Sequence, residues 1–577
     1  MPNPYAVAGD TRPSRLGNLL VFGDSYSAAN QTARPGVKVW PYRIVSSPFD
    51  YARGGASARN ESVNWLFNHK GAADNTFRTQ VDSWLGSSRA GAQQSNDLTV
   101  TYFGYNDILE PRNDLSISLH DYGEQIDRLL QNGVTSGDRK LFVTLVHDWS
   151  QVPRELAATA GGAESKQGRV DQWNQGVVDI ANSREGVIAV DLRTVFDRIA
   201  ADPDRYGFTN ITTADPGNAD TTALYFDDQH FGNRGQDIIA QVFRYYLTRG
   251  WSWANSVAAG SEAAAQLQSD IDQGLVFSLS QLAPDERQGL STFVIGDAGV
   301  REAELAQEEA AADPSRRQFT AAHLMEDSDR GIGVNYAFDP GTMLGMVISS
   351  YRVSEENKAE LATSQASVAS DAVSVYLRNR IAGFDLATTL SFGDDQHRKL
   401  DHDELIDASS DAAFGGRTTS IASTVSRPFR VGEGWLQPWL HLSHTVQKLD
   451  GFTQSNPYVS DVHYEGTSIT DTLASVGLVG RLDPLPVNED GWLALRGGLS
   501  YTYGLAQDDY RVTMREEGTG FVQHETVPRE TTRMIGLQLG GDLALGERFS
   551  LDASYEFGQQ LGGDAGHDLM AHLRYRF

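Results

Sequence analysis

The hydrophobic pattern of residues 317–577 constrains the fold of this chain more than any other feature. Apolar and polar side chains alternate there with a period of two, in segments of about ten residues. The clearest segment has Phe549, Leu551, Ala553, Tyr555 and Phe557 alternating with Ser550, Asp552, Ser554 and Glu556. Successive side chains of a β-strand point to opposite faces, so each segment has one apolar and one polar face. Long strands of this kind are typical of outer-membrane barrels and predict a transmembrane antiparallel β-barrel over residues 317–577.

Three features favour a barrel over a soluble β-sandwich, whose strands also alternate. The segments are long, Tyr and Phe cluster near their ends, and the chain stops on Phe577 at the end of a strand. We count about eleven clear strands and a weaker one around Gln318–Met325. Because single-chain barrels have an even number of strands, we predict about twelve.

Residues 15–250 follow a different pattern, in which apolar runs of strand length alternate with amphipathic stretches of helical length. The predicted strands are Leu19–Phe22, Leu98–Phe103, Lys140–Val146 and Val187–Asp191, and the predicted helices include Leu119–Gln131 and Val170–Asn182. This alternation predicts an α/β domain with a parallel sheet. Residues 251–316 are rich in Ala, Glu and Gln, which favour helix, and predict a helical linker that includes Ser261–Leu267 and Val300–Ala312.

Four short motifs in the α/β domain carry groups that ester hydrolysis needs. In the first, Gly23-Asp24-Ser25-Tyr26 follows a predicted strand. A tight turn at the end of a sheet can present the Ser25 hydroxyl as a nucleophile. In the second motif, the pair Gly54-Gly55 lets the backbone approach a ligand closely and can aim an N–H group at it.

The third and fourth motifs supply an amide and a His/Asp pair. The stretch Thr101–Asp107 contains Asn106, whose amide can donate a hydrogen bond to a developing oxyanion. In Tyr225–His230, His230 can act as general base and Asp227 can hold its tautomer. Taken singly, the motifs have structural alternatives: a plain turn at the glycines, a helix N-cap at Asn106, and a surface loop at His230. Their order, at the ends of predicted strands, favours catalysis.

The four motifs resemble the sequence blocks of the GDSL, or SGNH, hydrolases across residues 15–250. The resemblance implies a flavodoxin-like sheet, with Ser25 as nucleophile, His230 as base and Asp227 as the acid that orients it. It also implies an oxyanion hole made of the Ser25 N–H, the Gly55 N–H and the Asn106 side chain. Two positions depart from the family pattern. Tyr26 replaces Leu in the first block, and Asp50 replaces the Asn that often opens the second, which leaves Gly54 as an alternative to Gly55.

His147-Asp148 forms a competing His/Asp pair. Side chains that are adjacent on a strand diverge, so these two are poorly placed to act together. We interpret this pair as structural or substrate-lining, and expect His230 to be the base.

The order of the three regions resembles the GDSL-type esterase autotransporters of Gram-negative bacteria over the whole chain. These regions are the hydrolase passenger 15–250, the linker 251–316 and the barrel 317–577. The resemblance implies that a linker helix passes through the barrel pore and that the passenger is exposed at the cell surface. It also implies insertion into outer-membrane lipid by the cellular barrel-assembly machinery.

Composition excludes several classes of function. The 577-residue chain has no Cys, which removes disulfides, thiolate catalysis and Cys-based metal sites. Its formal net charge of −28 argues against nucleic acid as a partner, because such binding needs clustered Lys and Arg. Residues 1–14 lack the basic and apolar regions of a secretory signal, so in an exported chain we expect the signal to have been removed.

We therefore predict a cell-surface serine esterase or lipase that is anchored by its own barrel and needs no metal or organic cofactor. Its partners would be an ester substrate, either a lipid or an acylated small molecule, and outer-membrane lipid. Two alternatives stay open. One is a carbohydrate acetylesterase on the same scaffold, which Phe49–Ala56 and Tyr206–Phe208 also resemble. The other is a surface adhesin whose hydrolase-like domain only binds.

Overall fold

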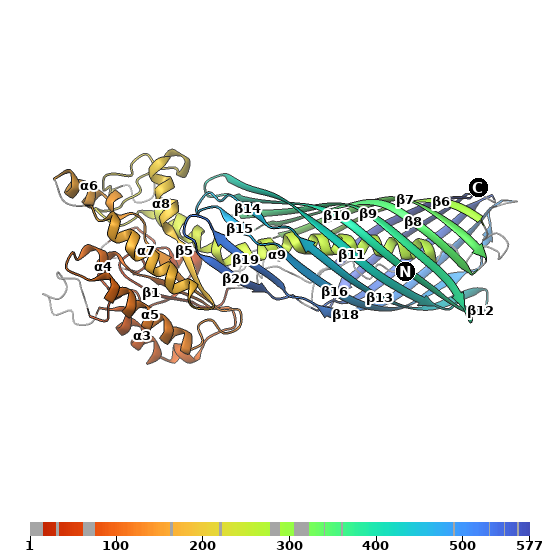
Figure 1. Cartoon of the computed structure of the whole chain (residues 1–577), viewed down its shortest axis with the longest axis horizontal. Helices are drawn as coiled ribbons and strands as arrows, with labels where there is room; N and C mark the ends of the chain where they lie inside the picture. The colour runs from red at the N-terminus through yellow and green to blue at the C-terminus, as the bar shows by residue number, and fades with distance from the viewer. Residues whose placement is uncertain are drawn as a thin grey trace.

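An α/β domain and a β-barrel lie at opposite ends of an elongated molecule, and one long helix joins them (Figure 1). The computed structural model describes residues 16–29, 34–61, 75–161, 165–217, 222–276, 289–304, 322–339, 341–358, 362–488, 491–529, 531–546, 549–561 and 565–576. Among the described residues, no helix has the length and apolar character needed to cross a membrane.

The α/β domain is built on a five-stranded parallel sheet, as predicted. Its strand order is β2 (Phe49–Asp50), β1 (Leu19–Gly23), β3 (Leu98–Tyr102), β4 (Lys140–Leu145) and β5 (Val187–Asp191). Every residue of β1, β3 and β5 is buried. Helices cover both faces of such a sheet, which explains why β1 is a continuous apolar run and why even the Thr side chains of β3 are buried.

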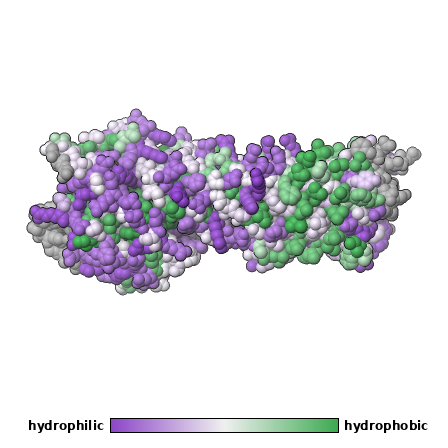
Figure 2. All heavy atoms as spheres, in the orientation of Figure 1, coloured by the Kyte–Doolittle hydropathy of each residue, from purple (hydrophilic) through white to green (hydrophobic). Residues whose placement is uncertain are grey.

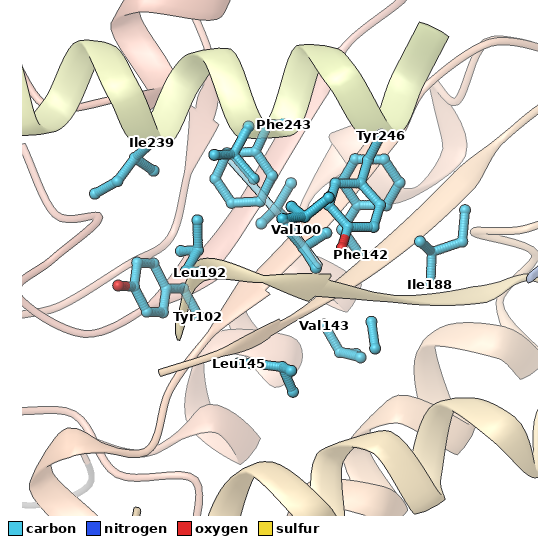
Figure 3. Close-up of a cluster of buried hydrophobic side chains, with 14 of the residues drawn as sticks. Val100, Tyr102, Phe142, Val143, Leu145, Ile188, Leu192, Ile239, Phe243 and Tyr246 are labelled. Carbon is cyan, nitrogen blue, oxygen red and sulfur yellow. The ribbon is translucent and has the colours of Figure 1, made fainter. Parts of the chain in front are cut away.

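The helices of this domain lie on the two faces of the sheet. They are α1 (Pro41–Ile44), α3 (Phe77–Leu85), α4 (Tyr105–Leu109), α5 (Leu115–Gln131), α6 (Pro153–Ala160), α7 (Gln167–Asn182) and α8 (Leu192–Ala201), with 3-10 turns η1 (Ser88–Gly91), η2 (Trp149–Gln151) and η3 (Asp204–Tyr206). Figure 3 shows Phe243 and Tyr246 of the joining helix on the same face as Phe142, whereas Val143 points to the opposite face. The rings of Phe142 and Phe243 stack with centroids 6.1 Å apart.

The joining helix α9 (Asn233–Val276) is continuous over 44 residues. At 1.5 Å per residue it is about 66 Å long. It begins in the α/β domain and runs into the barrel, where it lies beside β8, β9 and β10 (Figure 1). At the barrel mouth, the Ser252 hydroxyl donates to Asp401 Oδ1 at 2.9 Å and lies 2.8 Å from the Ser364 hydroxyl.

Twelve long antiparallel strands, counted among the described residues, close into the barrel. They are β6 (Gly289–Glu304), β7 (Ala322–Asp339), β8 (Thr342–Lys358), β9 (Ala362–Ile381), β10 (Phe384–Asp403), β11 (Ala408–Ser426), β13 (Gly434–Leu449), β16 (Thr467–Leu482), β18 (Gly491–Gln507), β21 (Arg533–Leu545), β22 (Phe549–Gln560) and β23 (Ala565–Arg576). The last strand, β23, pairs with the first, β6, and closes the barrel, with Ala571 opposite Gly296. The short strands β12 (Phe429–Val431) and β17 (Leu485–Pro486) extend two of the hairpins. The predicted fold class and strand number are confirmed.

The prediction of a helix over Val300–Ala312 is wrong for its first part, because residues 300–304 belong to strand β6. The barrel therefore begins at Gly289 rather than at 317, and the linker is shorter than predicted. Ala and Glu favour helix locally, but a membrane barrel must pair every strand edge. Pairing of β6 with both β7 and β23 overrides the local preference. The rest of the predicted helix, residues 305–312, lies outside the described residues. The weak strand predicted around Gln318–Met325 overlaps the start of β7.

The outer surface of the barrel changes from apolar to polar along its length. On β10 the outward side chains Leu390 and Phe392 are 42% and 56% exposed, while the inward side chains Thr389 and Ser391 are buried. Farther along the same strand the outward residues are Asp394, Gln396 and Arg398. Figure 2 shows the resulting apolar band at the barrel end away from the α/β domain, with a hydrophilic stretch between band and domain.

A third sheet, of four strands, lies between the barrel and the α/β domain (Figure 1). Its strands are β14 (Phe452–Gln454), β15 (Val462–Tyr464), β19 (Tyr510–Glu516) and β20 (Val522–Val527), from loops that connect barrel strands. We call it the collar sheet. It contacts α9 and the α/β domain, and the sequence pattern did not predict it.

Candidate active site

The Ser25 hydroxyl is presented by a turn that begins where β1 ends. The Gln80 side chain holds Gly23 at both sides, accepting from its N–H at 2.9 Å and donating to its carbonyl at 2.8 Å. Asp24 Oδ1 accepts the Tyr26 N–H at 2.9 Å, which closes the turn around Ser25. The hydroxyl is therefore carried by a rigid element at the carboxyl edge of the sheet.

The structure brings Ser25, His230 and Asp227 together although they are far apart in sequence. His230 Nε2 lies 2.8 Å from Ser25 Oγ, and His230 Nδ1 lies 2.7 Å from Asp227 Oδ2. Asp227 Oδ1 also accepts the N–H groups of Gln229 at 2.9 Å and of His230 at 2.6 Å. With Nδ1–H donating to Asp227, the unprotonated Nε2 faces the serine hydroxyl and can accept its proton.

The surroundings of Asp227 keep its carboxylate ionised. Partial burial raises the pKa of Asp227, but hydrogen bonds and charge interaction with His230, together with the two N–H groups, lower it. The net pKa lies below the usual value for Asp. The group is therefore negative at neutral pH and can stabilise a positively charged imidazole ring.

Tyr26 and Arg34 support the site in ways that sequence reasoning missed. The Tyr26 hydroxyl donates to the carbonyl of Gln229 at 2.6 Å, and its ring lies 5.4 Å from the ring of His230. Arg34 Nη2 donates to the carbonyls of Ser25 at 2.5 Å and Ala28 at 3.1 Å. These contacts fix the two loops that carry the nucleophile and the imidazole. Only the position of Tyr26 inside the first motif signalled such a role.

Asn106 and the glycine pair lie beside the serine. Gly104 follows β3 and has a φ of +130°. It packs so closely against Trp173 that a Cβ at this position would lie 2.4 Å from Trp173 Nε1. Helix α4 then starts, and Asn106 Nδ2 donates to the carbonyl of Ala56 at 2.8 Å and lies 3.4 Å from Asp24 Oδ2. The N-cap alternative for Asn106 is wrong, because Gly104 occupies that position.

The second motif approaches the serine through its backbone. A Cβ on Gly54 would lie 4.0 Å from the Cβ of Ser25. Gly55 has a φ of +77°, a backbone conformation that residues other than Gly rarely adopt, and it redirects the chain beside the serine. Both glycines therefore remain candidates for the backbone donor of the oxyanion hole.

Two buried carboxyl groups lie behind the serine. Asp107 accepts the N–H groups of Ala58 at 2.9 Å and Arg59 at 3.2 Å, which ties the second motif to α4. Burial, and to a smaller extent the charge of nearby Asp107, raise the pKa of Asp24 to about 7, although the Tyr26 N–H and Arg34 oppose the shift. Asp24 therefore acts as a scaffold whose protonation changes near neutral pH.

His147 lies in the core and does not pair with Asp148. Its ring nitrogen contacts the Tyr105 hydroxyl, and its ring lies 4.8 Å from that of Phe231. Complete burial lowers the pKa of His147 to about 3, so the ring is neutral. Asp148 instead caps η2 by accepting the Ser150 N–H at 2.9 Å. These contacts favour the structural interpretation of the pair. Within the described part of the chain, no group of three or more His, Asp or Glu side chains is arranged to hold a metal ion.

Two family models match the chain. One, described as GDSL-like Lipase/Acylhydrolase, matches residues 19–243, and the other, described as Autotransporter beta-domain, matches residues 331–556. The matched regions coincide with those whose motifs and strand pattern resemble these families, and that interpretation is confirmed. Comparison with curated proteins gives no significant match.

Several solved structures are similar to parts of the chain. The translocator domain of the autotransporter NalP from Neisseria meningitidis has 13% identity and a TM-score of 0.40, over 55% of this chain and 98% of that one. The transport unit of the autotransporter AIDA-I from Escherichia coli has 10% identity and a TM-score of 0.31, over 53% and 97%. The acetyl xylan esterase AlAXEase has 14% identity and a TM-score of 0.25, over 39% and 97%.

Proposed function

We propose that this chain, which joins a GDSL-like lipase/acylhydrolase domain to an autotransporter beta-domain, hydrolyses carboxylic esters through Ser25, His230 and Asp227. The autotransporter domain inserts into the outer membrane and exposes the hydrolase domain at the cell surface. The observation that carries the proposal is the hydrogen-bonded series from Ser25 Oγ through both ring nitrogens of His230 to Asp227.

In the proposed reaction Ser25 Oγ attacks the ester carbonyl while His230 Nε2 takes its proton. Asp227 stabilises the imidazolium that forms, because its lowered pKa keeps it ionised. The imidazolium then gives its proton to the leaving alcohol, which departs and leaves an acyl group on Ser25. Water, deprotonated by His230, attacks that acyl group; the bond between the acyl carbon and Ser25 Oγ then breaks, the imidazolium returns its proton to Oγ, and the acid is released.

The negative oxygen of the tetrahedral intermediate needs hydrogen-bond donors beside Ser25. We assign this role to the Ser25 N–H, the Gly55 N–H and Asn106 Nδ2, with the Gly54 N–H as the alternative backbone donor. Asn106 Nδ2 is held by the Ala56 carbonyl on one side, which supports this assignment by fixing the amide next to the glycine motif. Preorganised donors of this kind stabilise the transition state without reorganisation during the reaction.

Export and assembly complete the proposal. We expect the barrel to be inserted by the cellular barrel-assembly machinery, with outer-membrane lipid around the apolar band. The passenger stays connected to the barrel through the uninterrupted helix α9.

The test is hydrolysis of p-nitrophenyl esters of increasing chain length, and of acetylated sugars, by intact cells that display the full chain. We expect Ser25→Ala to lower kcat by a factor on the order of 10⁶ and to prevent labelling by a fluorophosphonate. The amount of heat-modifiable barrel in the outer membrane should be unchanged. Full activity in Ser25→Ala would reject the proposal. Hydrolysis of acetylated sugars alone would favour the acetylesterase alternative.

A further inference from the structure

The two edges of the parallel sheet face in opposite directions along the molecule. The amino-terminal edge faces the collar: Asp97, Lys140 and Val187 lie at the starts of strands and line a cleft of about 1150 Å³ together with Arg511, Gln523 and Glu525 of the collar sheet. Lys140 also forms an ion pair with Glu525. Because all strands are parallel, the carboxyl edge with Ser25 lies on the far side, away from the barrel.

Helix α9 gives the distance between the site and the barrel. Its first residue, Asn233, follows His230 closely, and Ser252 reaches the barrel mouth at Asp401. A helix rises 1.5 Å per residue, so the site lies about 28 Å above the barrel mouth. On β10 the last apolar side chain that is largely exposed on the outside is Phe392, and Asp394, Gln396 and Arg398 follow it. A tilted strand rises about 20 Å between Phe392 and Asp401. The triad therefore lies roughly 50 Å above the apolar band.

Buried polar contacts hold the domain in this orientation. Arg249 Nη1 donates to Glu516 Oε1 at 2.7 Å, with both side chains fully buried. The Tyr246 hydroxyl donates to the same oxygen at 2.6 Å. On another side of the domain, the Tyr206 hydroxyl donates to the Pro457 carbonyl at 2.5 Å. Tilting the domain toward the membrane would break these contacts and leave a buried charge without its partner, which is strongly unfavourable.

We infer that the active site works on esters that reach it from the medium or from an apposed surface, and that acyl lipids of its own bilayer are out of its reach. This inference rests on the proposed ester hydrolysis. A lipid of the same membrane would have to leave the bilayer completely and expose its chains to water, which the hydrophobic effect opposes. Esters in solution, or carried on structures that extend far from their anchor, meet no such barrier.

A tethered substrate can measure this distance. The full chain is reconstituted into vesicles that carry a short-chain fluorogenic ester linked to a lipid by a tether of one ethylene glycol unit or by a poly(ethylene glycol) able to extend beyond 100 Å. The free ester and both conjugates are first shown to be hydrolysed by the protein in detergent, with Ser25→Ala as the control. Inactivity on the free ester would reject the proposed function itself, separately from the inference about reach.

In vesicles diluted so that encounters between them are rare, we expect the long-tether ester to be hydrolysed at least 100-fold faster than the short-tether ester. A tether too short to span the distance gives an effective concentration near zero. The short-tether ester should remain at the Ser25→Ala background. Equal hydrolysis of both conjugates would overturn the inference, because it would show that the site reaches the bilayer. Hydrolysis of neither would also overturn it, because the height of the site would then exceed the value derived from α9 and β10.

Discussion

Strands β1 and β10 place their apolar side chains in opposite environments. All of Leu19–Gly23 is buried in protein, with helices on both sides of the sheet. In β10, Leu390 and Phe392 face outward and the polar Thr389 and Ser391 face the barrel interior. A continuous apolar run such as β1 therefore marks a strand covered on both faces, whereas alternation sustained over a long strand such as β10 marks a strand between lipid and a polar interior.

The two regions also distribute chemistry differently. In the hydrolase domain, the proposed function depends on a few side chains at one edge of the sheet, held by buried groups such as Asp24 and Asp107. In the barrel, polar side chains are spread along the inner wall, and the outward face depends only on being apolar. Changes in the first region should affect activity while the barrel stays intact, and changes in the second should affect insertion while the triad geometry stays intact.

The largest effect is expected from His230→Ala, compared with His147→Ala. Removing the proposed base should lower kcat by a factor on the order of 10⁶. His147→Ala removes a neutral core ring, so it should lower thermal stability and leave kcat per folded molecule nearly unchanged. The measurements are kcat per amount of folded full-length protein, thermal unfolding, and heat-modifiable mobility of the barrel. If the pure kcat loss in His147→Ala equalled that in His230→Ala, the assignment of the base would be wrong.

Glu516→Ala should be the next largest change, because it acts where the two regions meet. It leaves Arg249 buried without its partner, and breaking a buried pair costs about 3–5 kcal/mol. Because Glu516 also accepts from Tyr246, we expect a lower unfolding temperature of the hydrolase domain in the full chain. The neighbouring Glu517 is exposed, so Glu517→Ala is the matched control. Equal unfolding temperatures for the two variants would show that the collar does not stabilise the domain.

Much of this architecture could be predicted from the sequence because its signals are local. Strands β1, β3, β4 and β5 were predicted to within one residue, since each is a short and mostly apolar run of strand length. Alternation gave about eleven clear strands, and the even number expected of a single-chain barrel raised the prediction to about twelve, although one of the twelve, β6, lies in the predicted linker. Ser25 was found because its motif follows a predicted strand, and Asp227 and His230 were found because their motif places a His three residues after an Asp just before a helix-like stretch.

Features that depend on distant partners were not predicted. Strand β6 pairs with β23, nearly the whole barrel sequence away, and it was assigned to the linker because its last residues lead into an Ala-rich and Glu-rich segment. The collar strand β14 has three residues, too few to show any period. The contacts of Arg34 are local, since the Ser25 and Ala28 carbonyls lie only nine and six residues before it, but Arg34 belongs to no motif and so no sequence pattern predicted them.

Asn106→Ala tests whether the third motif acts in the transition state or only in the fold. Removing one oxyanion donor typically lowers kcat by about 10²–10³ with little change in KM. The variant also removes the donor to the Ala56 carbonyl, so thermal unfolding has to be measured beside the kinetics. A loss of stability with unchanged kcat would assign Asn106 a purely structural role.

Leu390→Arg and Gln396→Arg place the same charge on the outer wall of β10 at two heights. Leu390 lies in the apolar band, where an outward Arg near the bilayer midplane costs about 2–4 kcal/mol. Gln396 is outward and exposed above the band, so the same substitution should have almost no effect. The measurement is reversible unfolding of the barrel in lipid vesicles, with ester hydrolysis as the control. Equal destabilisation at both positions would show that the band is wider than the exposed apolar residues indicate.

The smallest effect is expected from Asp24→Asn. This variant should remove a pH dependence of stability that belongs to the hydrolase domain alone. The pKa of Asp24 is about 7 in the folded protein against an ordinary value of 3.8, so the folded state holds this proton more tightly than the unfolded state. Its contribution to stability is complete below about pH 4 and is lost as the pH rises through about 7. We expect the wild type to lose about 1–2 kcal/mol more than Asp24→Asn between pH 5 and 8, because local relaxation reduces the penalty of a buried charge. Thermal unfolding of the hydrolase domain across this range measures the difference, and barrel mobility should be the same in both proteins. If the unfolding temperatures of the wild type and Asp24→Asn changed in parallel with pH, ionisation of Asp24 would cost no stability. The turn around Ser25 would then be more hydrated than its burial indicates.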